Sequence, residues 1–170
     1  DTGNLTNILT LEEDYIDCES AVTIGKVNRM TIPKKRIIPS LPEGDNFTVG
    51  GCLAGLGLGS SSYIHGFFND NVIDFDIVLG NGDIMKNVSK TNNSDLYYGI
   101  GGTYGTMGII TRVKSKLIHC EKHVKIDYLN YNSFESFYRE FKKRINDKSD
   151  DFIEAFANKK ENYTIVAANF

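Results

Sequence analysis

Residues 48–62 read Thr48-Val-Gly-Gly-Cys-Leu-Ala-Gly-Leu-Gly-Leu-Gly-Ser-Ser-Ser62, with five glycines among fifteen residues and three hydroxyls at the end. Glycine has no Cβ, so it adopts positive φ readily and lets another group approach the main chain. Glycines this dense cost conformational entropy on folding, which a bound ligand can offset. The usual ligand is a phosphate or pyrophosphate held by successive backbone N–H groups. The stretch therefore predicts a nucleotide-binding loop.

Other interpretations of these glycines fit the flanking residues less well. Gly55-Leu-Gly57-Leu-Gly59 nearly matches the GxGxxG fingerprint of dinucleotide-binding folds. The residues before it are too rich in glycine for a buried parallel strand, and the triple serine is a poor helix opening. No lysine follows the glycines, which excludes a P-loop. A loop that only turns the chain remains an alternative, although Thr48 and the serines could donate hydrogen bonds to phosphate oxygens.

Composition and charge are those of an ordinary globular protein. The chain has 170 residues, 41% hydrophobic and 24% charged, and a net charge of −3. That charge gives no support to nucleic-acid binding. No apolar run is long enough to cross a bilayer, and no signal peptide is present. The potential glycosylation sites, Asn46 among them, follow from the abundance of asparagine, so we do not expect a secreted protein.

The three cysteines indicate a reducing compartment. Cys18, Cys52 and Cys120 are odd in number and widely spaced, with no CxxC pair. This pattern argues against a disulfide framework and against a zinc site. We therefore expect no metal site, and a reducing compartment: a cytoplasmic location, or an endoplasmic-reticulum-associated one on the reducing face.

Alternation and turn signals predict an α+β organisation for residues 1–120. Val72–Leu79 (VIDFDIVL) is the strongest strand candidate, and Asn81-Gly82 after it favours a tight turn. Thr23 is placed to cap a short helix. The expected strands are 5–11, 15–22, 72–79, 83–88 and 109–117, the expected helices are 23–32 and a short segment capped by Asn93 or Ser94, and three prolines keep 33–47 extended.

The chain changes character near residue 121, which predicts a second α+β subdomain over 121–170. An amphipathic helix is expected from Asn132, with Glu135 placed for a capping box. Strands are expected at 124–129, 152–157 and 163–168, with a turn over 159–162. One helical face gathers apolar side chains, a pattern typical of core packing. These are Phe134, Phe137, Tyr138, Phe141 and Ile145.

The glycine-rich stretch is one of six motifs that occur in order along the chain. They are Pro42-Glu43, Thr48-Val-Gly-Gly, the glycines that end in Ser60-Ser61-Ser62 before His65-Gly66, the strand Asp74–Gly80 before Asn81-Gly82-Asp83, Ser94-Asp-Leu-Tyr-Tyr98, and Gly101-Gly-Thr-Tyr-Gly105 before Gly108-Ile-Ile-Thr111. Together they resemble the FAD-binding domain of the vanillyl-alcohol-oxidase/p-cresol-methylhydroxylase (PCMH) type. Within that superfamily the chain looks most like the delta-24-sterol reductases. The likeness runs from about residue 4 to the end.

The resemblance implies FAD as the cofactor. It implies a PCMH-type lobe, a mixed or antiparallel sheet with flanking helices, over 1–120, and the beginning of a substrate or cap domain over 121–170. In this family backbone N–H groups hold the pyrophosphate, which agrees with the absence of Lys and Arg from residues 48–60. By carry-over, the cofactor contacts would be Thr48, Val49, Gly50, Gly51, Cys52, Leu53, Ala54, Gly55, Leu56, Gly57, Leu58, Gly59, Ser60, Ser61, Ser62, His65, Gly66, Ile109 and Ile110.

The resemblance also implies an activity. A sterol-reductase-like enzyme would pass hydride from NADPH through FAD to a C=C bond of a small molecule, such as a sterol. Alternatives are a sugar, alditol or alcohol oxidase of the same superfamily, or a non-catalytic nucleotide-binding remnant. No catalytic residue is predicted. Gly101, Gly102 and Gly105 would form either a second close approach to the cofactor or a turn.

The chain departs from the family pattern in two respects. The first FAD-binding half, with its own phosphate loop, is expected before Asp1, so these 170 residues alone would hold half a cradle. Any membrane association would likewise come from segments outside them. The sterol reductases place a histidine directly after the serine run, whereas this chain has Tyr63 there and His65 two positions later. His119 and His123 are expected at the surface.

Overall fold

The computed structural model describes residues 2–158 and 162–170. The chain divides into two compact units, Asp1–Cys120 and Glu121–Phe170. The division falls at the position where the sequence changes character. None of the helices among the described residues is long and apolar enough to cross a membrane.

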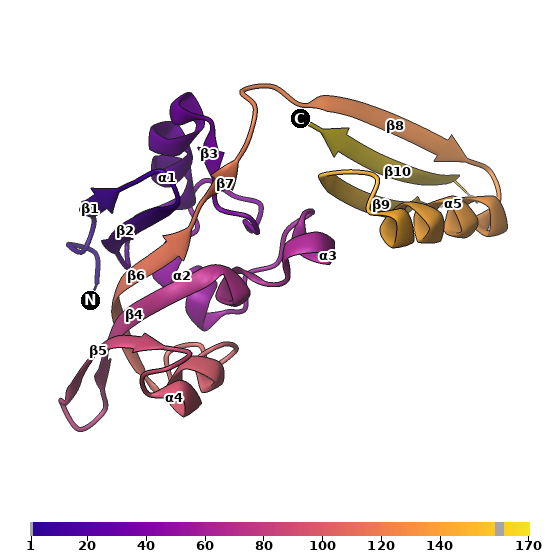
Figure 1. Cartoon of the computed structure of the whole chain (residues 1–170). Helices are drawn as coiled ribbons and strands as arrows, with labels where there is room; N and C mark the ends of the chain where they lie inside the picture. The colour runs from indigo at the N-terminus through magenta and orange to yellow at the C-terminus, as the bar shows by residue number, and fades with distance from the viewer. Residues whose placement is uncertain (1, 159–161) are drawn as a thin grey trace. The chain divides into compact units, whose positions relative to one another are not determined.

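The first unit is built on a five-stranded antiparallel sheet in the order β1-β2-β6-β4-β5 (Figure 1). Successive side chains of each strand point to opposite faces of this sheet. In β2, for example, Ile16 and Cys18 are buried on one face, and Asp17 between them points to the other. A separate two-stranded ladder pairs β3 with β7. The strands are β1 Ile8–Leu11, β2 Tyr15–Glu19, β3 Arg36–Ile37, β4 Val72–Leu79, β5 Ile84–Ser89, β6 Gly108–Lys116 and β7 Ile118–His119.

Short helices cover the apolar face of this sheet. Thr23 caps α1, as predicted, because its Oγ1 accepts a hydrogen bond from the N–H of Lys26 at 3.2 Å. Val49, Cys52 and Leu53 of α2 pack in the same core as Phe75 of β4. The helices are α1 Ile24–Thr31, α2 Val49–Ala54, α3 Ser62–His65 and α4 Ser94–Gly99, with 3-10 turns η1 Ile32–Lys34 and η2 Phe68–Asn71.

Parts of the first unit differ from the sequence prediction. The stretch expected to be a loop contains α2, because Thr48 caps it and burial of its apolar side chains outweighs the low helix propensity of Gly50 and Gly51. The serine run leads into α3 instead of a loop. The extended path expected over 33–47 is wrong at its start, where η1 forms a 3-10 turn, whereas β3 within it is extended as expected.

The second unit is a three-stranded antiparallel sheet, in the order β8-β10-β9, with one helix. Its elements are β8 Lys125–Tyr131, α5 Phe134–Asp147, β9 Phe152–Asn158 and β10 Asn162–Asn169. Ser133, not Asn132, caps α5, and Glu135 therefore lies in the first turn without forming the expected capping box. Residues 159–161 of the expected turn lie outside the described residues.

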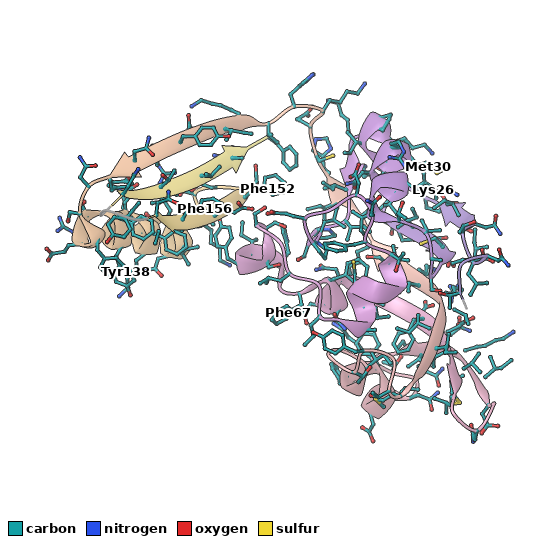
Figure 2. All side chains as sticks on the ribbon, turned by 180° about the vertical axis from the view of Figure 1, so that it is seen from behind. Lys26, Met30, Phe67, Tyr138, Phe152 and Phe156 are labelled. Carbon is teal, nitrogen blue, oxygen red and sulfur yellow. The ribbon has the colours of Figure 1, made fainter. Side chains whose placement is uncertain are left out.

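The aromatic face of α5 is only partly buried. Phe137 is buried and stacks on Tyr163 of β10, with ring centroids 5.2 Å apart. Phe134 and Tyr138 stack on each other but are 58% and 51% exposed. Strand alternation places Phe152 and Phe156 together on the other face of the sheet (Figure 2). The core prediction therefore holds for Phe137 and not for Phe134 and Tyr138, whose rings are exposed.

Candidate functional site

Two adjoining hollows flank the end of α2 in the first unit. The one on the sheet side has a volume of about 380 Å³, and the one on the loop side about 540 Å³. They share the lining residues Thr48, Gly51, Gly55 and Tyr104. The sheet-side hollow is completed by Thr2, Ser20, Gly50, Ala54, Gly105, Gly108, Ile109 and Ile110, and the loop-side hollow by Pro42, Asn46, Phe47, Cys52 and Gly57. The predicted stretch therefore meets residues 105–110, which lead into and begin β6, at one place.

The backbone donors at the start of α2 are already used within the chain. Val49 N donates to the carbonyl of Val22 and Gly50 N to that of Ser20, each at 2.9 Å. Gly51 N donates to Thr48 Oγ1 at 3.1 Å, and Cys52 N donates to Thr48 O. The start of this short helix therefore has no free first-turn N–H with which to hold a phosphate.

Free donors follow the helix instead. Alternate N–H groups are satisfied internally: Gly55 N by Gly51 O, Gly57 N by Cys52 O, and Gly59 N by Ser62 Oγ. In the described part of the chain, none of the N–H groups of Leu56, Leu58 and Ser60 donates to another group. Leu56 adopts a left-handed conformation, with φ of 55°. The loop thus presents unpaired peptide donors of the kind that anion-binding loops use.

The glycines of the stretch divide into two groups by what a Cβ would meet. At Gly50 it would lie 2.7 Å from Ser20 Cβ, at Gly57 2.6 Å from Pro42 Cγ, and at Gly59 1.8 Å from the carbonyl oxygen of Leu41. These three glycines allow the chain to pack against itself. At Gly51 and Gly55 the nearest atoms belong to the α2 segment itself and to Tyr104. Only this second pair leaves backbone exposed to both hollows.

The serine hydroxyls are largely engaged within the loop. Ser61 is 4% exposed, and its Oγ donates to Pro39 O at 2.8 Å. Ser62 Oγ accepts from Gly59 N and lies 2.6 Å from Ser40 Oγ. The expected donation to phosphate oxygens therefore has no support at these two residues, because the hydroxyls tie the loop to the segment before it. Ser60 keeps a free backbone donor.

The remaining predicted residues lie at different depths. Ile109 is 53% exposed in the sheet-side hollow, whereas Ile110 is 7% exposed beside it. Val49 and Leu53 are core side chains, each 1% exposed. The last two predicted residues, His65 in α3 and Gly66 at its C-cap, line neither hollow.

The sequence prediction missed several lining residues. Ser20 enters the site because β2 ends beside α2, and Phe47 because it precedes the Thr48 cap. Tyr104 lines both hollows and is 80% exposed. The motif that ends in Gly105 was the available signal for Tyr104, but spacing alone left a turn equally open. No sequence signal pointed to Ser20, whose position depends on the tertiary packing.

Among the residues that the structure describes, no charged side chain lines either hollow. Burial raises the pKa of the Cys52 thiol to about 11, so this wall is also neutral at physiological pH. Uncharged walls of glycine backbone, isoleucine and aromatic side chains suit a flat ring with polar edges. The unpaired N–H groups nearby suit phosphate oxygens. These residues therefore fit the two chemical parts of a flavin nucleotide.

The profile of the FAD binding domain family matches residues 1–87, half of the chain. The chain belongs to this FAD-binding domain family. The resemblance to PCMH-type flavoproteins and the α+β fold are thereby confirmed, and FAD is the cofactor.

Curated relatives point in the same direction. A delta(24)-sterol reductase of Arabidopsis thaliana is 32% identical over 131 residues, which is 76% of this chain and 23% of the relative. A delta(24)-sterol reductase homologue of Caenorhabditis elegans is 30% identical over 183 aligned residues, 99% of this chain and 34% of the relative. Cytokinin dehydrogenase 4 of Arabidopsis thaliana is 36% identical over 110 residues, 63% of this chain and 21% of the relative. The chain thus spans about a fifth to a third of the length of these relatives.

Proposed function

We propose that this chain is the FAD-binding part of a flavin-dependent oxidoreductase that passes hydride from NADPH to a C=C bond of a small, sterol-like molecule. The observation that carries the proposal is the family match over residues 1–87, together with the neutral hollows and free peptide donors in that segment or next to it. The similarity to delta(24)-sterol reductases supports the choice of a reductase and of a sterol-like substrate, for which we propose NADPH as the electron donor.

Residues 1–120 would hold the cofactor, and 121–170 would begin a substrate domain. The N–H groups of Leu56, Leu58 and Ser60 would bind phosphate oxygens, since none of the described residues that line the hollows is a cation. The backbone at Gly51 and Gly55 and the side chain of Ile109 would line the space for a ring. When bound, FAD supplies the hydride-carrying ring, and the protein binds and orients it.

The proposal also covers partners and location. We infer a small-molecule substrate and no nucleic-acid partner, because the net charge is −3. We place the protein in the cytoplasm or at the endoplasmic reticulum, on the reducing side. The three buried free thiols, Cys18, Cys52 and Cys120, support that compartment.

One other activity has a specific observation in its favour. The similarity to cytokinin dehydrogenase 4 extends to a flavoprotein that is not a sterol reductase. A superfamily oxidase or dehydrogenase acting on another small molecule is therefore the second candidate. The two differ in the electron donor: a reductase accepts hydride from NADPH, whereas an oxidase or dehydrogenase takes it from its substrate.

The test starts with the longest natural form of the protein. We expect a flavin absorbance band, or uptake of added FAD. Anaerobic NADPH should bleach that band, and a sterol with a side-chain double bond should restore it. Restoration only by oxygen would favour the oxidase. Failure to bind FAD at all would overturn the proposal and leave a non-catalytic remnant.

A matched pair of variants ties binding to this site. Gly55→Val places a branched side chain where the two hollows meet, and we expect about tenfold weaker FAD binding, equivalent to about 1.4 kcal/mol. Gly80→Val is the control, because a Cβ at Gly80 meets nothing within 4 Å and Gly80 lines neither hollow. Equal FAD affinities in the two variants would show that the cofactor does not bind at these hollows.

A further inference from the structure

Tyr104 is an unusually placed side chain. It is 80% exposed, the largest exposed fraction among the large hydrophobic residues of the described chain. Its backbone is left-handed, with φ of 49°, a conformation that bulky residues seldom adopt. Such conformations are strained and persist only when the surrounding structure holds them, often at ligand sites.

The surrounding turn holds Tyr104 firmly. Its N–H donates to Ala54 O at 3.2 Å, which ties the turn to the end of α2. Before it, Thr103 Oγ1 donates to Ile100 O at 2.7 Å, and after it, Thr106 N and Oγ1 both donate to Thr103 O. Hydrogen bonds of Tyr104 itself and of residues before and after it in the chain therefore hold its conformation.

The ring projects over the end of α2. A Cβ built on Gly55 would lie 3.7 Å from Tyr104 Cε1, so the ring lies next to glycine backbone with no side chain between them. Tyr104 lines both hollows, and the described residues that line them with it are all uncharged. Ile109 lines the sheet-side hollow and Phe47 the loop-side hollow, and each is 53% exposed. The result is an open aromatic wall between two apolar-sided spaces.

We propose that Tyr104 is a positioning residue whose ring stacks on a flat heteroaromatic ring of the bound nucleotide. Both an isoalloxazine and an adenine have such a ring, and both belong to FAD. Stacking would cover the exposed aromatic face, and the aromatic pair would add to the affinity beyond what the buried area contributes. The inference rests on the proposed FAD binding, but residue 104 lies beyond the segment that the family profile matches.

The test compares Tyr104→Leu with Tyr104→Phe in the full natural protein. Leucine keeps apolar bulk but cannot stack, so FAD affinity should fall roughly threefold to tenfold, and the fluorescence of bound flavin should rise if the stacked ring is the isoalloxazine. Phenylalanine should restore affinity to within about twofold. Tyr98→Leu is the matched control, because Tyr98 is also an exposed tyrosine (68%) but lines neither hollow.

Two further titrations identify the ring. If Tyr104 stacks on the isoalloxazine, Tyr104→Leu weakens FMN binding and leaves ADP binding unchanged; if it stacks on adenine, the reverse holds. Unchanged binding of FAD, FMN and ADP in Tyr104→Leu would overturn the inference, as would a Tyr104→Phe variant as weak as Tyr104→Leu. Because wild-type protein must bind FAD in the same series, failure of the proposed function would be seen separately, as absence of FAD binding in every variant.

Discussion

Gly59 illustrates how one residue type serves two purposes within a single motif. It lies in the predicted phosphate loop, yet an added Cβ would be 1.8 Å from the carbonyl oxygen of Leu41. No side chain can be accommodated there without moving backbone. A Cβ on Gly51 or Gly55, a few residues earlier, would meet only atoms of their own segment and, at Gly55, the ring of Tyr104. The contact that each glycine makes, rather than the motif, decides its role.

Gly59→Ala should therefore destabilise the protein without any cofactor present. We expect a loss of about 3 kcal/mol or more in the free energy of unfolding, because the methyl group overlaps a backbone oxygen. Urea denaturation of the FAD-free protein measures it. Gly80→Ala is the control and should change stability by less than about 0.5 kcal/mol, since nothing lies within 4 Å. A stable Gly59→Ala variant with weaker FAD binding would show that Gly59 contacts the ligand instead.

The buried Cys18 thiol makes the stability of the protein depend on pH in the alkaline range. Burial, and secondarily the neighbouring Asp17 carboxylate, raise the pKa of its thiol from 9.0 to about 12. The unfolded chain releases this proton above pH 9, whereas the folded chain keeps it until about pH 12. The unfolded state thus binds fewer protons in that window, and stability falls as pH rises through it.

The expected size of this effect is modest but measurable. Between pH 8 and pH 10 the Cys18 thiol should lower the free energy of unfolding by about 1.4 kcal/mol, because pH 10 lies one pH unit above the ordinary thiol pKa of 9.0. Cys18→Ala should therefore lose less stability over this range than the wild type, by that amount, in urea titrations at both pH values. The comparison cancels the tyrosines and the other cysteines, which both proteins share. Parallel pH profiles would contradict the assigned pKa.

At the scale of elements, Arg112 joins three strands on the outer face of the sheet. From β6 its guanidinium donates to Asp17 of β2 at 2.5 Å, and to Asp74 and Asp76 of β4 at 2.8 and 3.2 Å. Burial alone would lower the pKa of Arg112, but the hydrogen bonds to Asp17 and Asp74 outweigh it and raise the pKa. One cation thereby offsets three carboxylates whose side chains are less than a fifth exposed.

Arg112→Met should destabilise the first unit by on the order of 3 kcal/mol, because it leaves three partly buried carboxylates without their cation. Lys114→Met is a matched control on the same strand and face. This substitution also removes one positive charge, but the contact that it removes is the one between the Lys114 ammonium group and the Tyr15 ring, worth roughly 0.5–1 kcal/mol. Chemical denaturation at low and moderate salt measures both. Equal losses would mean that net charge, not the Arg112 cluster, sets the stability.

Element boundaries show what local sequence can and cannot predict. β4 begins and ends at Val72 and Leu79, as predicted, because its alternation and the turn after it are strong local signals. α2 was not predicted, since Gly50 and Gly51 have poor helix propensity and its stability comes from burial of Val49, Cys52 and Leu53. The tertiary core overrides local preference there.

At the scale of the whole molecule, the two units differ in how much core each one has. The first unit buries nineteen apolar residues in one cluster. In the described part of the second unit, Phe137, Ile153, Ile165, Ala167 and Ala168 are the buried apolar residues. A domain of this size buries too little surface to be more than marginally stable. The second unit should therefore open more readily than the first.

Native-state hydrogen exchange tests this difference. Amides of β6, such as Val113, should be more strongly protected than those of β10, such as Ile165. Phe137→Ala should remove protection across 121–170 and leave β6 unchanged, because each unit has its own core. Phe134→Ala, which truncates a 58% exposed ring on the same helix, should have a much smaller effect. Uniform protection in both units, or loss of β6 protection in Phe137→Ala, would show a single cooperative structure.

The sequence alone determined the α+β class, the family and the placement of most strands. Those properties depend on residues near one another in the chain: alternation in β4, the Thr23 cap, and the order of motifs from Pro42 to Gly108. Strand positions and motif order can therefore be predicted without knowing which segments pack against them.

Only the tertiary structure decided which residues of the glycine-rich stretch can face a ligand. The donors of Val49, Gly50 and Gly51 are used by partners, two of them in the β2–α1 region some thirty residues away, while those of Leu56 and Ser60 stay free. Tyr104 likewise enters the site because its turn is hydrogen-bonded to the end of α2. Hydrogen-bond satisfaction and steric contact between distant segments cannot be read from spacing, because they exist only after the chain has folded.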